Sequence, residues 1–492
     1  MTNEQMREAD RLAMASGMAD TTLMEHAGRG VFEAVTKRFS PVPTVVICGP
    51  GNNGGDGFVV ARLLAKAGWP LTLGLLGKRE SLKGSAATMA ERWVGPILPA
   101  EKTRPEEAGL IVDALFGSGL ARPLEGTARL IVERIAASGG KVVAVDIPSG
   151  LNADTGHIGT AAAKACLTVT FFRKRPGHLL FPGRTLCGET IVADIGMADD
   201  TLLSIAPRTY QNGPAFWGED FPRPHPEGHK YDRGHAVVVS GGPRHTGAAR
   251  LAARGALRIG AGLVTVASPR EALDVNAAHM TAIMLTKVDD GCDLARLLAD
   301  KRYSSIALGP GAGLDETTRT RRDAALQSGA GVVLDADAIS ISGDDPQSLY
   351  DMIAAKPDRP VVLTPHEGEF ARLFPDLAKG YPSKLERARR AARRSGAVIL
   401  LKGPDTVVAA PDGRAVINSN APPNLATAGS GDVLCGFAAG LLAQAMPPFA
   451  AAAAAVWCHG MAGQVVGAGL IAEDLPDAII EVLKEIDRSV KQ

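Results

Sequence analysis

The chain has 492 residues, of which 46% are hydrophobic and 22% charged, a composition typical of folded globular proteins and not of disordered ones. Its 53 basic residues equal its 53 acidic residues, so the overall charge favours neither nucleic acid nor an anionic membrane as a partner. A chain of this length exceeds one ordinary hydrophobic core, and we expect two large domains or three smaller ones.

The cysteines and the N-terminal residues indicate a cellular compartment. The six cysteines stand singly with no C-x-x-C pair, which disfavours a zinc site and a disulfide framework and fits a reducing environment. Residues 1–10 are polar and acidic where a signal peptide needs a basic start followed by an apolar run. We therefore expect a cytoplasmic protein.

Residues 1–210 have the pattern of an α/β domain, a parallel sheet covered by helices on both faces. One or two helices are expected between Met6 and Val35, and short apolar runs separated by helix-length segments follow. The expected strands are 44–49, 71–76, 110–115, 141–146, 166–172 and 189–194. Because ligands of such sheets bind beyond the carboxyl ends of the strands, the residues after each run are candidates for a site.

Four of these strand ends carry polar residues: the segment after residue 49, Asp113, Asp146 and Asp194, of which Asp194 has an equal claim to be only a cap or turn residue. Residues 49–54 match the dinucleotide fingerprint G-x-G-x-x-G, but the next strand ends without the acidic residue that would bind a ribose. The segment continues to Asp56 as a Gly-rich loop that we expect a ligand to approach closely. Asn53, Asp113 and Ser149 would supply hard oxygens at one sheet edge, which suits a monovalent or hard divalent cation.

Residues 211–234 are dense in Pro and Gly and are predicted to form a linker. A second α/β domain is expected over 235–492, with a hairpin that turns at Asp412-Gly413. Its expected strands are 235–240, 263–267, 305–308, 331–335, 360–364 and 397–402. The apolar region 435–472 is rich in weakly apolar Ala and Gly and is interrupted by Pro447-Pro448, so it predicts buried helices and not a membrane span.

The segment 424–440 contains the clearest chemical signal of the second domain. Gly429, Ser430 and Gly431 lead into apolar residues spaced four apart, which predicts a Gly-rich loop that enters a buried helix. Free N–H groups and the helix dipole make such an end a site for a phosphate or a developing oxyanion. Asp432 could then accept a proton from a hydroxyl that attacks a phosphoryl group, or it could be only an acidic residue favoured in a first helical turn.

Four further strand ends of this domain are candidates: 241–250, 309–313, 364–369 and 402–406. Three of them have an alternative structural explanation: a plain turn for 309–313, a capping box between Thr364 and Glu367, and a solvated side chain for Lys402. The Walker sequence G-x-x-x-x-G-K-[ST] does not occur, so a P-loop is not expected.

The first half resembles the NAD(P)H-hydrate epimerases over residues 1–210, on the basis of motifs at 49–62, 113–120 and 145–150. The resemblance implies a Rossmann-like three-layer sandwich that interconverts the R and S forms of hydrated NADH and NADPH. It implies a potassium ion held by Asn53, Asp113 and Ser149, and we expect Asp146 to act as the acid/base residue. The substrate contacts that it implies are Asn52, Asn53, Gly54, Gly55, Asp56, Gly117, Ser118, Gly119, Leu120, Ala121, Arg122, Pro123 and Asp146.

The second half is similar to the NAD(P)H-hydrate dehydratases, within the ribokinase-like class, over residues 229–490. The similarity implies phosphorylation of the hydrate hydroxyl by ADP or ATP and then elimination of phosphate to give NADH or NADPH, with Asp432 as base. The implied hydrate contacts are Ala248, Gly311, Gly313, His366 and Asp432. The implied nucleotide contacts are Lys402, Gly403, Pro404, Asp405, Thr406 and Gly431.

Two further expectations concern this phosphoryl-transfer site. Magnesium is implied, with Asp335, Asp337 and Glu369 as possible outer-shell ligands. Ala428 stands where the family pattern leads us to expect Gly, which leaves the geometry of the phosphate loop open.

Together the two resemblances predict a bifunctional cofactor-repair enzyme whose epimerase converts the R hydrate into the S hydrate that the dehydratase uses. Two alternatives remain at this point: a small-molecule kinase with an accessory domain, and a non-catalytic nucleotide-binding protein. The sequence does not distinguish ADP from ATP. We expect no nucleic-acid or membrane partner, and a homo-oligomer to which the long N-terminal helices could contribute contacts.

Overall fold

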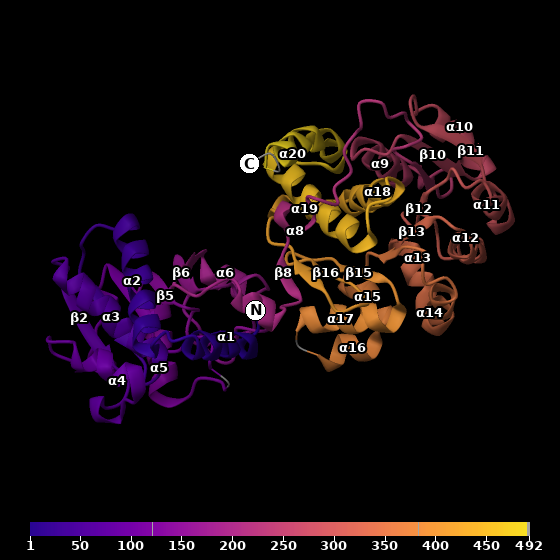
Figure 1. The fold of residues 1–492 in the computed structure, drawn as a ribbon. Coiled ribbons are helices and arrows are strands. Elements are labelled where there is room, and N and C mark those ends of the chain that lie inside the picture. The colour runs from indigo at the N-terminus through magenta and orange to yellow at the C-terminus, as the bar shows by residue number, and fades with distance from the viewer. Residues whose placement is uncertain (121, 382, 490–492) are drawn as a thin grey trace. The chain divides into compact units, whose positions relative to one another are not determined.

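The computed structural model describes residues 1–120, 122–381 and 383–489 and divides into a first unit, Met1–Pro207, and a second unit that begins at Arg208 (Figure 1). The predicted boundary was residue 210. The division falls earlier because Thr209–Gln211 forms strand β8, which pairs with a strand of the second unit.

The first unit contains a seven-stranded parallel sheet in the order β3-β2-β1-β4-β5-β6-β7. Its strands are β1 Thr44–Cys48, β2 Leu71–Leu75, β3 Leu98–Pro99, β4 Leu110–Ala114, β5 Lys141–Val145, β6 Leu167–Phe171 and β7 Glu189–Ala193. Its helices are α1 Asn3–Ala15, α2 Asp20–Arg38, α3 Asn52–Lys66, α4 Gly84–Glu91, α5 Gly126–Ala137, α6 Gly183–Cys187 and α7 Thr201–Ile205. All six predicted strands are present.

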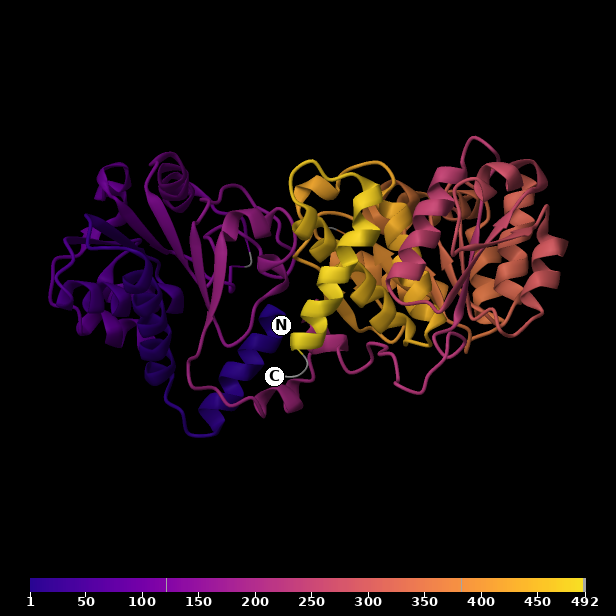
Figure 2. The same cartoon turned by 90° about the horizontal axis from the view of Figure 1, so that it is seen from above.

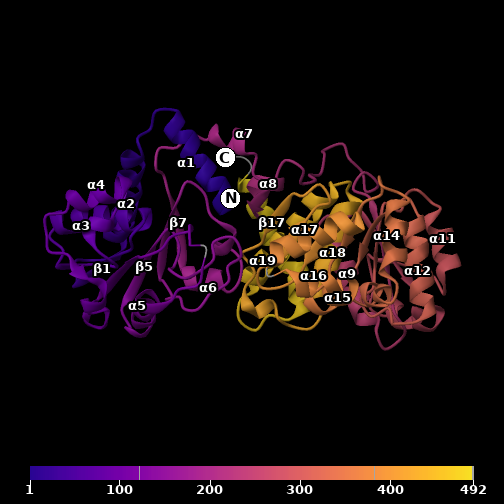
Figure 3. The same ribbon diagram turned by 90° about the horizontal axis from the view of Figure 1, so that it is seen from below.

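Two hydrophobic cores, one on each face of this sheet, make the unit a three-layer sandwich, as predicted. Alternate residues of a strand point to opposite faces, so Val46 packs with residues of α2 and α3 while Val45 packs with α5. Figure 3 shows α5 on the opposite side of the sheet from α2 and α3. The carboxyl ends of the strands therefore form the open edge of the sandwich.

The second unit contains a ten-stranded sheet in the order β11-β10-β9-β12-β13-β14-β15-β16-β17-β8, in which only β16 is antiparallel to its neighbours. Its strands are β8, β9 His235–Val239, β10 Leu263–Ser268, β11 Met284–Lys287, β12 Ser305–Leu308, β13 Gly331–Leu334, β14 Val361–Leu363, β15 Val398–Leu401, β16 Val407–Ala409 and β17 Ala415–Ile417. The six predicted strands are present, and β16 and β17 confirm the predicted hairpin.

Helices cover both faces of this sheet as well. They are α8 Pro214–Trp217, α9 Thr246–Arg258, α10 Leu273–Ala277, α11 Gly291–Leu298, α12 Glu316–Gln327, α13 Ala336–Ser340, α14 Pro346–Ala354, α15 Glu367–Leu373, α16 Pro375–Gly380, α17 Lys384–Ser395, α18 Ser430–Ala443, α19 Pro448–Val466 and α20 Leu475–Ser489. Helices α9 and α18, drawn in magenta and yellow, pack side by side although they are distant in sequence (Figure 2).

The predicted linker, 211–234, is in part built into the second unit. Trp217 of α8 is fully buried, and its indole Nε1 donates a hydrogen bond to Asn212 Oδ1 at 3.2 Å. Asn212 in turn donates to Asn418 Oδ1 at 3.0 Å and to the Ala453 carbonyl at 2.8 Å. The Pro and Gly content marks turns but does not show that a large aromatic side chain among them belongs to a core. Residues 218–234 contain only turns and bends.

The apolar region near the C-terminus forms buried helices, as predicted. All residues of α18 from Val433 onward are buried, and the first half of α19 is buried as well. In the described part of the chain, α19 is the one helix whose length and hydropathy would allow a membrane crossing, and 72% of its apolar window lies inside the unit.

Candidate active sites

A cleft of about 670 Å³ lies at the carboxyl ends of β1, β4 and β5 in the first unit. Nine of the predicted substrate contacts line it: Asn52, Asn53, Asp56, Gly117, Ser118, Gly119, Leu120, Arg122 and Asp146. Gly54, Gly55 and Pro123 do not line it, and Ala121 lies outside the described residues. The cleft is also lined by residues that no motif predicted, from α1, from α2 and from the segment after β6.

The segment 52–57 is not the loop that its glycines suggested, because α3 already begins at Asn52. A Cβ at Gly54 would lie 1.9 Å from the Gly49 carbonyl oxygen, and a Cβ at Gly55 would lie 2.4 Å from Met24 Sδ. These two glycines are therefore required by the close packing of α3 within the unit. The N-terminus of α3 brings Asn52, Asn53 and Asp56 to the cleft.

Asp113 and Ser149, two of the predicted cation ligands, are in direct contact and are fully buried. Ser149 donates to Asp113 from its hydroxyl at 2.6 Å and from its backbone N–H at 2.9 Å. Asn53 reaches the neighbouring backbone. With its side-chain amide assigned in the orientation that satisfies both groups, it accepts from the Gly117 N–H at 3.3 Å and donates to the Val145 carbonyl at 3.1 Å. Burial raises the pKa of Asp113, and the hydrogen bonds from Ser149 oppose this effect only in part.

Asp146 follows β5 in a left-handed backbone conformation, with φ of 65°, and its carboxylate is held from several sides. Its Oδ2 accepts from the Ser118 N–H at 2.7 Å, and its Oδ1 accepts from the Thr170 hydroxyl at 2.9 Å and lies 3.5 Å from Arg175 Nη2. Burial alone would raise the pKa of Asp146, but the Arg175 charge and the hydrogen bonds outweigh it, so the pKa lies below its ordinary value. The side chain is thus ionised near neutral pH.

His178 fixes the backbone of Asp146. Its Nδ1 accepts from the Arg175 N–H at 2.9 Å, and its Nε2 lies 2.8 Å from the Asp146 carbonyl oxygen, to which it donates. Burial lowers the pKa of His178 to about 4, so the ring is neutral and holds this tautomer.

In the second unit, α18 begins at the predicted Gly-rich segment with Asp432 in its first turn. The residue in the left-handed conformation is Gly429, with φ of 85°. Ala428 does not adopt a positive φ and is exposed, so its methyl group does not strain the backbone of this turn. Burial raises the pKa of Asp432 to about 6; Asp335 and Asp337 add to this shift and Lys402 opposes it.

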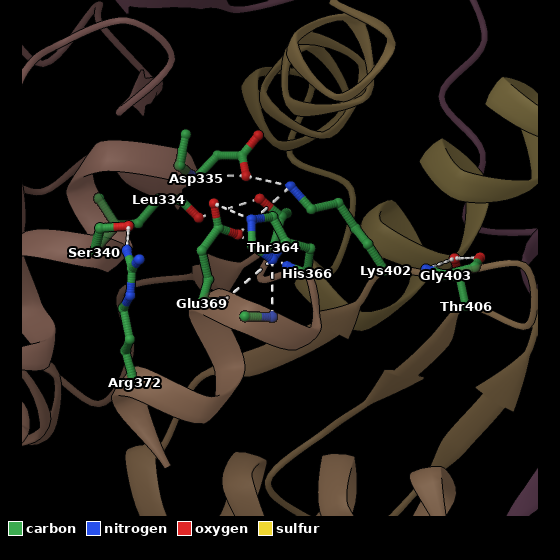
Figure 4. Close-up of polar contacts among 12 residues, drawn as sticks. Leu334, Asp335, Ser340, Thr364, His366, Glu369, Arg372, Lys402, Gly403 and Thr406 are labelled. Atoms are coloured by element: carbon green, nitrogen blue, oxygen red, sulfur yellow. Dashed lines mark hydrogen bonds and ion pairs between the residues drawn. The ribbon is translucent and has the colours of Figure 1, made fainter. Parts of the chain in front are cut away.

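Lys402 connects the neighbouring strand ends (Figure 4). Its Nζ donates to Asp335 Oδ1 at 2.6 Å and lies 3.8 Å from Glu369 Oε2. A Cβ at Gly431 would lie 3.8 Å from the same Nζ, which places the ammonium group against the first turn of α18. Burial lowers the pKa of Lys402, but the two carboxylates outweigh burial and raise it, so the side chain is charged and is not the freely solvated lysine of the alternative prediction.

The capping box after β14 is formed by His366 and Glu369, whereas the structural alternative drawn from the sequence paired Thr364 with Glu367. His366 Nδ1 accepts from the Glu369 N–H at 3.2 Å, and Glu369 Oε2 accepts from the His366 N–H at 2.8 Å. Thr364 instead donates its hydroxyl to the Leu334 carbonyl at 3.2 Å (Figure 4). The helix begins two residues later than the prediction placed it, because Thr364 and Pro365 still belong to the connection from the strand.

The segment 402–406 is held by an ion pair beneath it. Lys384 Nζ donates to Asp405 Oδ1 at 2.8 Å and to the Lys402 carbonyl at 3.2 Å. The Thr406 hydroxyl donates to the Gly403 carbonyl at 2.7 Å. A carboxylate and a hydroxyl of this segment are thus already used to shape it, which leaves its backbone as the surface for a ligand.

The two glycines predicted to contact the hydrate lie beside the start of α9. Gly311 has φ of 65°, and a Cβ there would lie 3.5 Å from the Cβ of Ala248. The Gly313 N–H donates to Asp337 Oδ2 at 2.9 Å. The strand ends after β12 and β13 are therefore joined, and Asp337 is oriented by that bond. Across the described ranges, no group of three or more His, Cys, Asp or Glu side chains forms a ready-made metal site.

Comparison with known families shows two matches along the chain. The profile described as NAD(P)H-hydrate dehydratase matches residues 236–485, and the profile described as YjeF-related protein N-terminus matches residues 20–177. Both agree with the resemblances that the motifs predict.

Full-length relatives and solved structures are also similar to this chain. A protein named bifunctional NAD(P)H-hydrate repair enzyme Nnr from Moorella thermoacetica is 36% identical over 100% of this chain and 98% of its own length. A protein of the same name from Thermofilum pendens is 36% identical over 91% of this chain and 88% of its own length.

Among solved structures, an ADP/ATP-dependent NAD(P)H-hydrate dehydratase from Bacillus subtilis, co-crystallised with ATP/Mg²⁺, is 30% identical with a TM-score of 0.49, over 56% of this chain and 97% of that one. A ribokinase-like superfamily protein from Enterococcus faecalis is 24% identical with a TM-score of 0.50, over 56% of this chain and 96% of that one. The second likeness shows a ribokinase-like fold.

Proposed function

This chain belongs to the family of bifunctional NAD(P)H-hydrate repair enzymes, and on that premise we propose that the first unit epimerises hydrated NADH and NADPH while the second unit dehydrates the S form with ADP or ATP. The observation that carries the proposal is the presence, in one chain, of two strand-end sites that contain different reactive groups. One has an ionised carboxylate in a large cleft, and the other has a carboxylate beside a helix N-terminus and a lysine.

In the epimerase site, Asp146 is the base. Epimerisation by loss and return of water requires a proton to be taken from the water that adds, and an ionised carboxylate in hydrogen-bond reach of the cleft performs this task. The Ser118 N–H and Thr170 hydroxyl fix its two oxygens, so the lone pairs directed at the cleft have a defined position.

The donor set around Asp113 fits a potassium ion. Asp113 is a fully buried carboxylate whose described partners are all hydrogen-bond donors of Ser149 and Leu115 and include no cationic side chain. Such a group is expected to hold a cation together with the oxygens of Ser149 and Asn53. The ion would supply positive charge beside the loop that carries Gly117 and Ser118, and these residues would then be positioned to bind the substrate.

In the dehydratase site, Asp432 accepts the proton of the hydrate hydroxyl as the hydroxyl attacks the terminal phosphoryl group. The free N–H groups at the start of α18 and the Lys402 ammonium bind the charge that develops on the transferred group. Ala248, Gly311, Gly313 and His366 would border the hydrate. The backbone of 402–406 with Gly431 would bind the nucleotide.

Magnesium would be held here mainly by nucleotide phosphates and water, because Mg²⁺ needs only one or two carboxylates in such sites. Asp335, Asp337 and Glu369 are the carboxylates that could contact the ion through water, as outer-shell ligands. Lys402 partly neutralises Asp335 and Glu369. The ion would supply further positive charge to the phosphoryl group as it moves.

The experiment that tests the function follows the near-ultraviolet absorbance of reduced nicotinamide, with a mixture of R and S hydrates of NADH, magnesium and potassium. ADP and ATP are added in turn. Complete conversion with one nucleotide supports both activities and identifies the donor, and Asp432→Asn should abolish it. Conversion that stops at the S fraction would show that the first unit is not an epimerase. No signal with either nucleotide, together with a stable phosphorylated product, would favour a kinase instead.

A further inference from the structure

We infer that Asp10 of α1 is a second catalytic residue of the epimerase cleft, which donates a proton to the departing hydroxyl while Asp146 accepts one from the incoming water. This inference rests on the proposed epimerase activity of the first unit. No motif marked Asp10, and its role emerges only when α1 is seen as a wall of the cleft.

Helix α1 presents one face to the cleft. Asn3, Met6, Arg7 and Asp10 all line it, and their spacing of three, four and seven residues places them on one side of a helix. Ala9 and Ala13, on an adjoining face, are buried in the hydrophobic core of the unit. The helix is therefore packed into the unit while its polar stripe faces the space where a substrate would lie.

The start of α1 is fixed in place. Thr2 and Gln5 form a capping box, and the Asn3 N–H donates to Asp154 Oδ1 at 2.8 Å. Asp154 belongs to the segment after β5, so the helix is anchored to the same edge of the sheet that carries Asp146. Asp10, two turns further along, is thus held at a defined position on the wall.

The carboxyl group of Asp10 is not used by the protein itself. No described residue forms a hydrogen bond with it, whereas Asp20 accepts from the Ser85 hydroxyl and Asp146 accepts from Ser118 and Thr170. Asp56 shares this lack of a hydrogen-bond partner among the described residues, but its side chain is buried. Asp10 is half-buried and lines the cleft. An unengaged carboxyl group directed at a cleft is available to a substrate.

The charged groups that share the cleft with Asp10 come from each surrounding element. They are Arg7 on the same helix, Asp20 from α2, Asp56 from α3, Arg122 after β4, Asp146 after β5 and Arg175 after β6. Helix α7, which also packs against α1, carries no charged residue. Burial raises the pKa of Asp10 to about 6, Arg175 opposes this, and Asp146 and Asp20 add to it.

The pKa values of the Asp10 and Asp146 carboxyl groups are therefore shifted in opposite directions. The pKa of Asp146 is held low by Arg175 while that of Asp10 is raised, so between these values one group is an ionised base and the other a protonated acid. They also come from different layers, since Asp146 stands at the sheet edge and Asp10 on a covering helix. Inversion of a carbon by loss and return of water needs such a pair of groups.

The step balances without a further reactant. The bond between the hydrated carbon and its oxygen breaks, the electron pair leaves with the oxygen, and the proton of Asp10 converts that oxygen to water. The lone pair of the adjacent ring nitrogen stabilises the resulting cation. Water then adds to the opposite face, the new carbon–oxygen bond forms, and the extra proton passes to Asp146. In the reverse direction the two residues exchange roles.

Asp56 is the competing candidate for the acid. Burial raises its pKa well above the ordinary value, and Asp146, Asp10 and Asp20 add to the shift. However, Asp56 of α3 is buried, and its charge also affects the buried Cys48. Asp10 is only half-buried, and Asp20, the other cleft carboxyl group outside α3 and the sheet edge, is already engaged by Ser85, so Asp10 is the more accessible acid.

The test measures formation of the R hydrate from the pure S hydrate by chiral chromatography, on the full-length protein, with potassium and without nucleotide. Asp10→Asn should lower kcat by about 100-fold, the usual contribution of a general acid, with KM changed less than about twofold. The wild-type kcat should fall above about pH 6, and Asp10→Asn should lose this alkaline limb. Asp10→Glu should restore part of the rate. Glu8→Gln, an exposed neighbour on α1, is the matched control and should behave as wild type.

Each result discriminates between the inference and its premise. A wild-type rate no faster than the enzyme-free blank would overturn the epimerase function itself. If the wild-type protein is active but Asp10→Asn has the same kcat and pH profile, the inference alone is overturned. The same holds if Asp56→Asn loses the decrease in kcat above pH 6 and Asp10→Asn keeps it. Retained dehydration of the S hydrate, on addition of nucleotide, shows that the second unit of each variant has folded. A thermal unfolding transition of the first unit that matches the wild type, together with the rate recovered in Asp10→Glu, shows that the first unit has folded as well.

Discussion

Asp432 shows how the surroundings of one residue determine its chemistry. A carboxylate in a first helical turn is ordinarily a cap, but here burial and two neighbouring carboxylates raise its affinity for a proton, while Lys402 keeps the ionised form accessible. A base whose pKa lies just below neutral pH combines a high fraction of the ionised form with an appreciable basicity.

The dehydratase should accordingly lose activity in mild acid. Protonated Asp432 cannot accept the hydroxyl proton, so kcat/KM should be constant above about pH 6 and should decrease roughly tenfold per pH unit below it. The measurement is the rate of NADH formation from S hydrate across this range. Glu481→Gln, which removes an exposed carboxylate of α20, should leave the limb in place. A limb centred near pH 4 would show that the pKa of Asp432 is not raised.

Gly117 is a second residue whose identity the cleft requires. A Cβ there would lie 2.9 Å both from the Asn53 side-chain amide and from Asp146 Oδ2, so Gly117→Ala should displace the base and strongly lower epimerase kcat/KM. Dehydration of the S hydrate should be unchanged. At Gly119 a Cβ would meet no atom within 4 Å, and Gly119→Ala should therefore have a smaller effect. Equal losses in the two variants would contradict a role for the Gly117 contacts.

At the scale of elements, the apolar runs predicted every buried strand. Six runs in each half became strands because a parallel strand covered on both faces needs apolar side chains at successive positions. The strands that the sequence did not predict are β3, β8 and β11, and each is an edge strand with largely exposed or half-exposed residues. An edge strand can alternate or lack apolar residues, so it need not leave such a run, although β7, the other edge strand of the first sheet, does leave one.

The same contrast explains the sites. Polar residues at the ends of buried strands are conspicuous, and Asp113, Asp146 and Lys402 could be predicted as candidates from them. Asp432 could be predicted from the Gly-rich segment that leads into a helix. The stripe of α1 that lines the first cleft could not, because spacing of three and four residues is common to every amphipathic helix. Gly54 and Gly55 were expected to contact the substrate, but they are required by packing. A glycine needed for packing and a glycine needed for a ligand look alike in a sequence.

The first turn of α18 depends on Gly429. With φ of 85° and a Cβ position 2.8 Å from Leu251 Cδ1 and 3.0 Å from Ala472 Cβ, Gly429→Ala should both strain the backbone and clash. We expect a loss of at least about 1 kcal/mol in the free energy of unfolding of the second unit, with reduced dehydratase kcat. Chemical unfolding and NADH formation measure the two effects.

Ala428→Gly is the matched control for that change. The exposed Ala428 does not have a positive φ, so exchanging it for the Gly of the family pattern should alter kcat little. A large gain in activity from Ala428→Gly would show instead that its methyl group limits the phosphate loop.

At the scale of the molecule, the residues of each proposed site all belong to one unit. The reaction sequence should therefore not require both sites on the same chain. Equal amounts of full-length Asp146→Asn and Asp432→Asn, mixed together, should convert an R and S mixture completely to NADH, as the wild type does. Asp146→Asn alone should stop near the S fraction plus spontaneous epimerisation. Incomplete conversion by the mixture would show that the hydrate must pass between sites on one chain.

Strand β8 has a consequence for the order in which the chain can fold during its synthesis. It is the first strand of the second unit in sequence but the last in the sheet, and its hydrogen-bonding partner is β17. The ribosome releases the whole first unit before β8 emerges, and domains generally fold as they are made. The second unit, by contrast, cannot complete its sheet until Ile417 has been translated, so a ribosome paused before that residue would carry a finished epimerase and an open-edged dehydratase.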